Sequence, residues 1–376
     1  MNRAAPVGLY IHLPFCRKKC YYCDFACYAG QEKYLDDYLL ALERELKEYP
    51  SDLDVRTLYL GGGTPSILSP LQLERLMRVL ETHTSVRPEA ERTMEVNPGT
   101  GGSALWKTAF DSGIRRMSLG VQTLDETLLK SLGRDHTVAD VHRTLEEIRA
   151  AGISDISLDL IYGLPGQTME SWEHTIAEAL ELRPTHFSVY GLILEERSVF
   201  GLWHQQGKLQ LPTEDLEISM GDLLNARLHE AGYQRYEISS WSLPGFEADH
   251  NRIYWRAEPY IGLGTGAHSC WQNHRYENPR GIGDYLKNPM PAFAGTPELG
   301  RREEQEEVAF LGLRMTEEGL DKARYFQRFG ESPEETFPEA ITSLLQEALI
   351  VDRGDRYTLT PRGIWLSNEV FARFIT

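Results

Sequence analysis

The chain is arranged around one short cysteine-rich run, Cys16-Arg17-Lys18-Lys19-Cys20-Tyr21-Tyr22-Cys23-Asp24-Phe25. The run places three thiols within eight residues, directly after a mainly apolar segment at residues 7–12 that is typical of a strand. Three thiols at C-x3-C-x2-C spacing favour a [4Fe-4S] cluster, because they bind three irons and leave the fourth open to an exchangeable ligand. A structural zinc site would instead need a closed set of four ligands.

A fourth thiol lies close to this run. Cys27 extends it to C-x3-C-x2-C-x3-C, so an open cluster with three cysteines and a closed cluster with four are both compatible with the spacing. A disulfide is the remaining alternative. The chain has only five cysteines, with Cys270 as the other one outside the motif, and this usage is typical of a reducing compartment.

The length, hydrophobic content and net charge of the chain indicate a globular protein. The 376 residues suffice for one barrel-sized domain and a smaller one, and a hydrophobic content of 41% is ordinary for a soluble globular protein. The net charge of −17 argues against a broad nucleic-acid or anionic-membrane surface. We find no secretory signal and no apolar run of about eighteen residues, and therefore expect a cytoplasmic protein with at most peripheral membrane contact.

Hydrophobic periodicity predicts strands that alternate with helices. The expected strands are residues 7–12, 56–60, 93–96, 116–121, 155–161 and 186–194, and the expected helices include 32–49, 69–83, 103–112 and 168–182. Strands separated by helices of this length call for a parallel sheet. Six such units indicate an α/β fold, namely an incomplete (β/α)6 barrel.

Polar residues recur at period two near the ends of these strands, where the active sites of such barrels lie. They are Tyr10 and His12, Glu95 and Asn97, Ser118 with Gly120 and Gln122, Ser157 with Asp159, and Ser188 with Tyr190. A single polar residue there is usually only the start of a loop. Five strands with the same pattern favour a polar ligand site. The turn Gly61-Gly62-Gly63-Thr64-Pro65 adds a place where backbone can approach a ligand, although such a turn alone is weak evidence.

The cysteine motif, with an aromatic residue before its last cysteine, resembles the signature of the radical S-adenosylmethionine (SAM) superfamily. This resemblance implies a [4Fe-4S] cluster on Cys16, Cys20 and Cys23, SAM on the open iron, and no ligand role for Cys27. It also implies the following SAM-binding residues: Tyr10 and Tyr22 as aromatic contacts, Gly62, Gly63 and Thr64 at the methionine amino group, Glu95 at the ribose, and Gln122, Arg134 and Asp159 at a second SAM.

These motifs further resemble the branch of oxygen-independent coproporphyrinogen III oxidase. Two departures are visible: Asp24-Phe25 stands where those oxidases carry Gly-Cys, and only fifteen residues precede Cys16, where they carry a long extension. The resemblance therefore leaves decarboxylation of porphyrinogen propionates in doubt.

Residues His250-Asn251-Arg252-Ile253-Tyr254-Trp255 are similar to the HNxxYW motif of the HemW heme chaperones. The similarity implies heme as a ligand. His250 can ligate its iron, and Tyr254 and Trp255 can stack on the porphyrin. We place the motif in a loop-rich segment and expect heme binding to weaken as the pH falls toward about 6.5, the ordinary imidazole pKa. The alternative is that these side chains only pack against the open side of the barrel.

Beyond residue 300 the pattern changes to three helices, a hairpin around Gly354 and a last helix from Pro361, which is typical of a winged-helix-like domain. Few clustered basic residues lie near the wing, so a docking or lid role is favoured over DNA binding. We therefore divide the chain into a radical SAM partial barrel at 1–240, a barrel-closing segment at 241–300 and an α+β winged-helix-like domain at 301–376.

The family resemblances leave two functions open. The first is a heme carrier that passes heme to acceptor apoproteins such as respiratory cytochrome subunits, with the cluster and SAM in a regulatory or assembly role. The second is a radical SAM coproporphyrinogen III dehydrogenase or another tetrapyrrole-modifying enzyme. The sequence identifies no catalytic residue and leaves monomer and homodimer both open. It predicts [4Fe-4S], SAM and heme as ligands and no nucleic acid as a partner.

Overall fold

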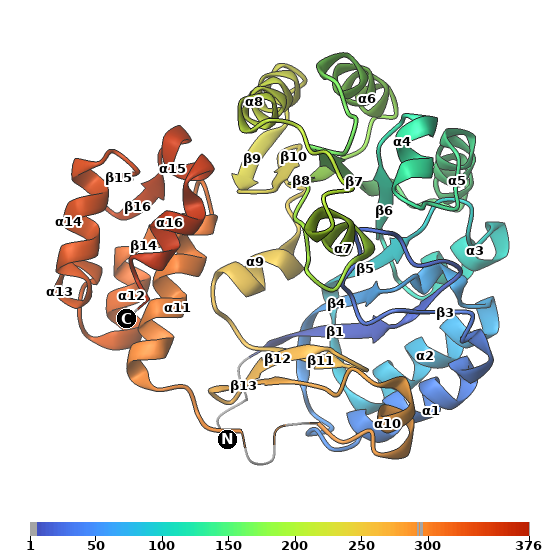
Figure 1. The fold of residues 1–376 in the computed structure, drawn as a ribbon. Helices are drawn as coiled ribbons and strands as arrows, with labels where there is room; N and C mark the ends of the chain where they lie inside the picture. The colour runs from blue at the N-terminus through green and yellow to red at the C-terminus, as the bar shows by residue number, and fades with distance from the viewer. Residues whose placement is uncertain (1–5, 292, 294–295, 376) are drawn as a thin grey trace.

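The computed structural model describes residues 6–291, 293 and 296–375, and its largest element is one sheet of eleven strands (Figure 1). The strand order is β13-β12-β11-β1-β4-β5-β6-β7-β8-β10-β9, and all neighbours from β11 to β8 run parallel. Among the described strands, β13 and β9 each have a partner on one side only, so the barrel is open. The predicted incomplete α/β barrel is confirmed. Its six predicted strands are β1 (Val7–Leu13), β4 (Asp54–Gly62), β5 (Ser85–Val96), β6 (Arg116–Gln122), β7 (Asp155–Tyr162) and β8 (His186–Gly191).

Helices cover the outer face of the parallel strands (Figure 1). Their starts follow from capping residues: the Ser69 and Thr168 side chains accept amide hydrogens from the first turns of α2 and α6. The helices of this layer are α1 (Leu35–Leu46), α2 (Pro70–His83), α3 (Ser103–Asp111), α4 (Glu126–Ser131), α5 (Val138–Ala150) and α6 (Met169–Glu181), and α7 (Val199–Gln205) and α8 (Glu214–Glu230) follow β8.

Two strand boundaries differ from the prediction. β5 begins at Ser85 instead of residue 93, because its first residues pair with Asp54 and Val55 at the start of β4. β8 ends at Gly191 instead of residue 194, and β10 accompanies it only as far as Ser188. Strand length here is set by the neighbouring strands, which a local pattern does not contain.

The segment after α8 completes both edges of the sheet. β9 (Gln234–Glu237) and β10 (Ser240–Ser242) extend the edge at β8, while β11 (Tyr260–Leu263), β12 (His268–Trp271) and β13 (His274–Glu277) extend the edge at β1, with α10 (Ile282–Lys287) behind them. Between the two edges lies α9 (Asp249–Trp255), which contains the HNxxYW residues. The prediction of a loop-rich setting is therefore wrong for these residues. The division of the chain at residues 240 and 300 stays a prediction.

The C-terminal part folds around its own apolar core, which includes Leu313, Tyr325 and Phe374. Its helices are α11 (Arg301–Arg314), α12 (Lys322–Phe329), α13 (Pro333–Thr336), α14 (Pro338–Gln346), α15 (Pro361–Trp365) and α16 (Ser367–Ala372). The predicted hairpin is present as β15 (Ile350–Asp352) and β16 (Arg356–Leu359). A third strand, β14 (Leu320–Asp321), joins that hairpin and directly precedes α12.

Among the described residues, no helix combines the length and the apolar character that a membrane span requires.

A buried carboxyl group ties the first helix to the edge of the sheet. Glu45 of α1 is fully buried, and its oxygens accept hydrogen bonds from the Gly264 amide, the Asn278 side chain and the Tyr285 hydroxyl. Burial raises the pKa of Glu45 to about 7, above the ordinary glutamate value of about 4.3. Between these two values the folded state binds more protons than the unfolded state, so this group makes the fold less stable as the pH rises.

Glu45→Gln should remove that pH dependence. We expect the free energy of unfolding of the variant, relative to wild type, to rise by up to about 3 kcal/mol between pH 5 and pH 8, because only the wild type must bury a charge. Thermal unfolding of both proteins at several pH values measures this difference, and effects common to both proteins cancel. A difference that stays constant with pH would contradict the assignment.

Candidate functional site

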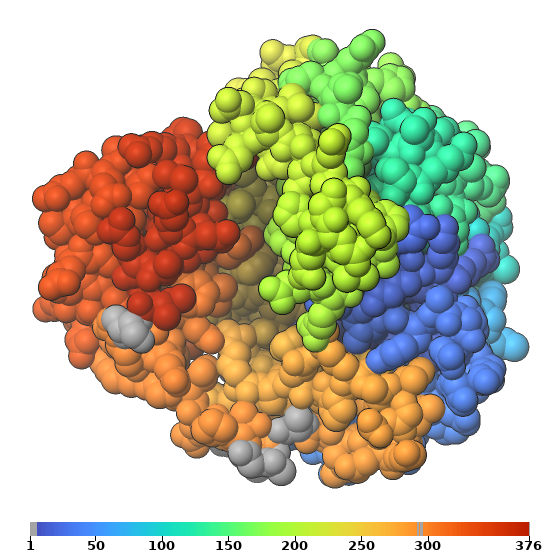
Figure 2. All heavy atoms as spheres, in the orientation of Figure 1, coloured from blue at the N-terminus to red at the C-terminus, as the bar shows by residue number. Residues whose placement is uncertain are grey.

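The carboxyl ends of the parallel strands open into one large cavity of about 1100 Å³. Residues of β1, of β4 to β8, of the cysteine loop, of α9 and of α11 form its wall. Figure 2 shows the molecule hollowed between the C-terminal domain (red) and the segment that carries α7 (yellow-green). A pocket for one drug-sized ligand measures roughly 300–1,000 Å³, so this cavity is as large as the largest of such pockets.

The structure brings together all of the predicted site residues except His250. The positions that line the cavity are Tyr10, Cys16, Cys20, Tyr22, Cys23, Gly62, Gly63, Thr64, Glu95, Gln122, Arg134 and Asp159. They come from separate strands and loops, and they meet because parallel strands direct their carboxyl ends to the same rim.

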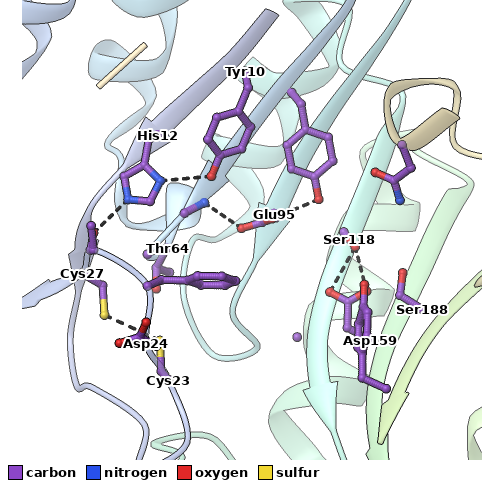
Figure 3. Close-up of a pocket in the computed structure, with 18 of the residues that line it drawn as sticks. Tyr10, His12, Cys23, Asp24, Cys27, Thr64, Glu95, Ser118, Asp159 and Ser188 are labelled. Carbon is purple, nitrogen blue, oxygen red and sulfur yellow. Dashed lines mark hydrogen bonds between the residues drawn. The ribbon is translucent and has the colours of Figure 1, made fainter. Parts of the chain in front are cut away.

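The cysteine loop is anchored to the end of β1 by His12 (Figure 3). Nε2 of His12 lies 2.8 Å from the carbonyl oxygen of Ala26, and Nδ1 lies 3.0 Å from the hydroxyl oxygen of Tyr10. Burial lowers the pKa of His12 to about 4, so the ring is neutral at pH 7, with Nε2–H as donor to Ala26 and Nδ1 as acceptor from Tyr10. The base of the loop is closed by β2 (Phe15–Cys16) and β3 (Tyr28–Ala29), which pair in parallel.

Hydrogen-bond donors face two of the predicted ligand thiols. The Thr64 hydroxyl donates to Sγ of Cys16 at 3.5 Å, and Nη1 of Arg134 donates to Sγ of Cys20 at 3.4 Å. Hydrogen-bond donors and a cation can also stabilise a sulfur that is bound to metal. The local environment therefore suits these cysteines as ligands.

The fourth thiol of the loop, Cys27, lies beside the predicted ligand Cys23. Its Sγ is 3.8 Å from Sγ of Cys23. Hydrogen bonding with Cys27 lowers the pKa of Cys23 to about 7 and also lowers the pKa of Cys16, whereas these bonds raise the pKa of Cys27 itself. Cys27 is thus the least acidic of these three thiols.

The arrangement of sulfurs fits a cluster better than a single ion. Within the described parts of the chain, no three His, Cys, Asp or Glu side chains meet closely enough to hold one metal ion. A cubane cluster has no such requirement, because each cysteine binds a different iron. Three cysteines on one loop in the wall of a large cavity would therefore suit a [4Fe-4S] cluster.

The glycine turn after β4 is required by close packing. Gly62 has a φ of +110°, and a Cβ there would lie 2.7 Å from the His12 ring, while a Cβ on Gly63 would lie 2.7 Å from the carbonyl oxygen of Phe15. Larger residues would push the cysteine loop away from β4. The turn thus holds backbone groups and the cysteine loop against the same part of the cavity.

Glu95 presents a carboxyl group at the centre of the cavity wall (Figure 3). Its oxygens accept hydrogen bonds from the Gly62 amide at 2.9 Å and from the Tyr59 hydroxyl at 3.0 Å. Desolvation, and then the charge of Asp159, raise the pKa of Glu95 to about 8. At pH 7 the group is therefore mainly a neutral acid that can both donate to and accept from a hydroxylated ligand.

A second acid lies across the cavity on β7. Oδ1 of Asp159 accepts a hydrogen bond from the Ser118 hydroxyl at 3.0 Å, and desolvation raises the pKa of Asp159 to about 6. Gln122, at the end of β6, has a φ of 69°, a left-handed conformation that is uncommon outside glycine. Strain of this kind is typical of ligand sites, and here it accompanies a residue that lines the cavity.

Arg134 connects the strand rim to the cysteine loop. Besides Cys20, its guanidinium contacts the side-chain oxygen of Asn97 and the carbonyl oxygen of Gly120. Arg134 thus holds β5, β6 and the loop in one arrangement and supplies a positive charge to the cavity.

His250 does not line the cavity. It is 1% exposed, with Nδ1 2.8 Å from the Thr57 hydroxyl and Nε2 2.8 Å from the Tyr254 hydroxyl. Burial lowers the pKa of His250 to about 3, so the loss of heme binding expected near pH 6.5 has no basis in this structure. The motif residues that do line the cavity are Asn251, Tyr254 and Trp255.

Sequence reasoning missed the part of the wall that comes from the edge strands and the C-terminal domain. Arg275 of β13 and Phe310 and Leu311 of α11 line the cavity, and Arg275 forms an ion pair with Glu307. No local motif marks these residues. Phe310 and Leu311 reach the cavity because α11 packs beside α9, and Arg275 reaches it from the added edge strand β13.

Cys27→Ala should leave the iron content of the reconstituted protein unchanged, because three other cysteines suffice for a cluster with one open iron. Cys16→Ala, Cys20→Ala and Cys23→Ala should each lose most of it. Iron and sulfide analysis after anaerobic reconstitution, with far-UV circular dichroism as a control for folding, measures this. Loss of the cluster in Cys27→Ala with retention in Cys23→Ala would overturn the ligand set.

Comparison with known proteins identifies the family of the chain. Residues 10–179 match the family model of the radical SAM superfamily, and residues 299–366 match that of the HemN C-terminal domain. The solved structure titled "Coproporphyrinogen III oxidase (HemN) from Escherichia coli is a Radical SAM enzyme" has a TM-score of 0.84 and 24% identity, over 99% of this chain and 90% of that one. The two proteins therefore share a fold.

Curated relatives extend over nearly the whole chain. Heme chaperone HemW of Lactococcus lactis subsp. lactis is 38% identical over 371 residues, which cover 98% of this chain and 97% of that protein. Heme chaperone HemW of Bacillus subtilis is 38% identical over 377 residues, which cover 97% of this chain and 98% of that protein. With the superfamily match and the cysteine-lined cavity, these similarities establish that the chain belongs to the HemW family of the radical SAM superfamily.

Proposed function

We propose that this chain binds heme and delivers it to acceptor apoproteins. The observation that carries the proposal is the near full-length similarity to proteins named heme chaperone HemW. The cavity supports it, because aromatic and apolar side chains of α9 and α11, namely Tyr254, Trp255, Phe310 and Leu311, line one side of it and suit a porphyrin plane.

The cysteine side of the cavity holds a [4Fe-4S] cluster and SAM in this proposal. Cys16, Cys20 and Cys23 bind the cluster, and the backbone of Gly62, Gly63 and Thr64 lies where the methionine part of SAM would be held. Tyr10 and Tyr22 contact SAM, and Glu95 binds the ribose hydroxyls. Gln122, Arg134 and Asp159 lie further along the rim and suit a second polar ligand. When bound, the cluster supplies one-electron chemistry to SAM.

Further parts of the proposal follow from the family. Acceptors include apoproteins such as respiratory cytochrome subunits, and delivery takes place in the cytoplasm by a monomer or a homodimer. His250 belongs to the heme site, in contact with Tyr254. Arg275 lines the same cavity, and its guanidinium supplies a cation for the heme carboxylates.

A second candidate function is a tetrapyrrole-modifying radical SAM reaction, such as anaerobic coproporphyrinogen III dehydrogenation. The observation in its favour is the pair of acids with raised pKa, Glu95 and Asp159, in the same large cavity.

An anaerobic assay separates the two functions. The reconstituted protein, with SAM, reductant and coproporphyrinogen III, should form no protoporphyrinogen, whereas the protein loaded with hemin should pass heme to an excess of apomyoglobin. Product analysis and the absorbance of holomyoglobin measure these outcomes. Multiple turnover to protoporphyrinogen would reject the carrier function.

Trp255→Ala should weaken hemin binding by about tenfold, because it removes an aromatic face worth about 1.4 kcal/mol from the cavity wall. The matched control is Trp365→Ala, which changes a half-exposed tryptophan of α15 that is not part of that wall. Hemin titration of each variant with its cluster intact measures the affinities. Equal weakening in both variants would place heme elsewhere.

A further inference from the structure

The HNxxYW residues offer two groups that can bind iron, the imidazole of His250 and the phenol of Tyr254. They lie 2.8 Å apart, measured from Nε2 to the phenol oxygen. The two differ in access: His250 is buried behind the wall, whereas Tyr254 is half-buried and forms part of the wall. A ligand in the cavity therefore meets the phenol before the imidazole.

Both ring nitrogens of His250 already have partners. Nδ1 lies 2.8 Å from Oγ1 of Thr57 on β4, and the ring stacks on Tyr59 of the same strand, with centroids 5.0 Å apart and an interplanar angle of 26°. Iron at Nδ1 would separate His250 from Thr57, and iron at Nε2 would displace the Tyr254 hydroxyl. Either change would leave a buried polar group unpaired, which is costly.

We propose that Tyr254, and not His250, is the side chain that ligates the iron of bound ferric heme, and that His250 is a positioning residue that orients Tyr254 through their hydrogen bond. This inference rests on the proposed binding of heme in the cavity. Tyrosine is a known axial ligand of heme iron in proteins.

The step balances without an oxidant or a reductant. The O–H bond of Tyr254 breaks, its oxygen forms a bond to Fe(III), and the proton leaves as water with the hydroxide ligand that free hemin carries in solution. The ring of His250 stays neutral. With its proton on Nε2 it donates to the phenolate, and its Nδ1 accepts a hydrogen bond from the Thr57 hydroxyl, so both ring nitrogens keep partners.

The neighbours of Tyr254 suit a porphyrin bound through that oxygen. The ring of Tyr260 packs edge-on against Tyr254, with centroids 4.6 Å apart, and its hydroxyl accepts a hydrogen bond from Nη1 of Arg275 at 2.8 Å. Phe310 and Leu311 line the same cavity from α11. The phenol therefore has apolar surface for a macrocycle nearby and a guanidinium for its carboxylate groups.

The ligand can be identified by spectroscopy on the cluster-loaded protein titrated with hemin. We expect the wild type to show iron–phenolate modes in its resonance Raman spectrum. Tyr254→Phe should abolish these modes and lower the affinity for hemin at least tenfold. Tyr254→His should restore binding with an imidazole signature, because the new ligand occupies the same place. Tyr260→Phe, the matched control, should keep the phenolate modes.

Other outcomes overturn the inference. An imidazole signature in the wild type that persists in Tyr254→Phe and disappears in His250→Ala would assign the iron to His250. Phenolate modes that persist in Tyr254→Phe would assign it to another tyrosine. If the wild type takes up no hemin at all, the proposed heme function fails, and the ligand assignment fails with it. Iron–sulfur absorbance and far-UV circular dichroism of each variant identify any that fails to fold.

Discussion

The parallel pairing of β1 with β4 on one side and β11 on the other is the interaction on which the rest of the structure depends. It buries β1 within the sheet and sets Tyr10 opposite Tyr59 and Gly262. The cysteine loop leaves from the end of β1, so this register also sets where the thiols lie relative to the strand rim. Because β10 and β11 lie at opposite edges of the parallel strands, the connection that contains α9 must cross the open side of the barrel (Figure 1).

The polar groups of the cavity wall differ between its two sides, and burial of each group costs free energy unless it is hydrogen-bonded. Glu95 and Asp159 both have a raised pKa, and each acid accepts hydrogen bonds from neutral donors. Arg134, by contrast, faces the cysteine side, where thiolates favour a cation. The wall thus has a cysteine side with a positive charge and a strand side with two weak acids. A ligand with hydroxyl and amino groups can form hydrogen bonds with the two acids of the strand side, and an iron–sulfur cluster can bind the thiols of the cysteine side.

How far the site could be predicted depended on whether a residue's position follows from local chain geometry. The cysteines, the glycine turn and Glu95 follow strand ends in the sequence, and parallel strands bring their ends together, so these residues were predicted to meet and do meet. Arg275, Phe310 and Leu311 come from an edge strand and a separate domain, and no pattern near them indicates a ligand. His250 was predicted at the cavity, but the packing of α9 on β4 turns its ring toward Thr57.

The sequence by itself determined the superfamily and the six central strands of the sheet, because thiol spacing, alternation of strand and helix, and turn glycines are local properties of the chain. Only the tertiary structure decided which members of the HNxxYW motif face the cavity. A seven-residue helix presents different faces to the sheet and to the cavity, and the side that each residue faces depends on how the helix packs between β4 and α11. The same packing buried His250 and left Tyr254 at the wall, a difference that no residue spacing records.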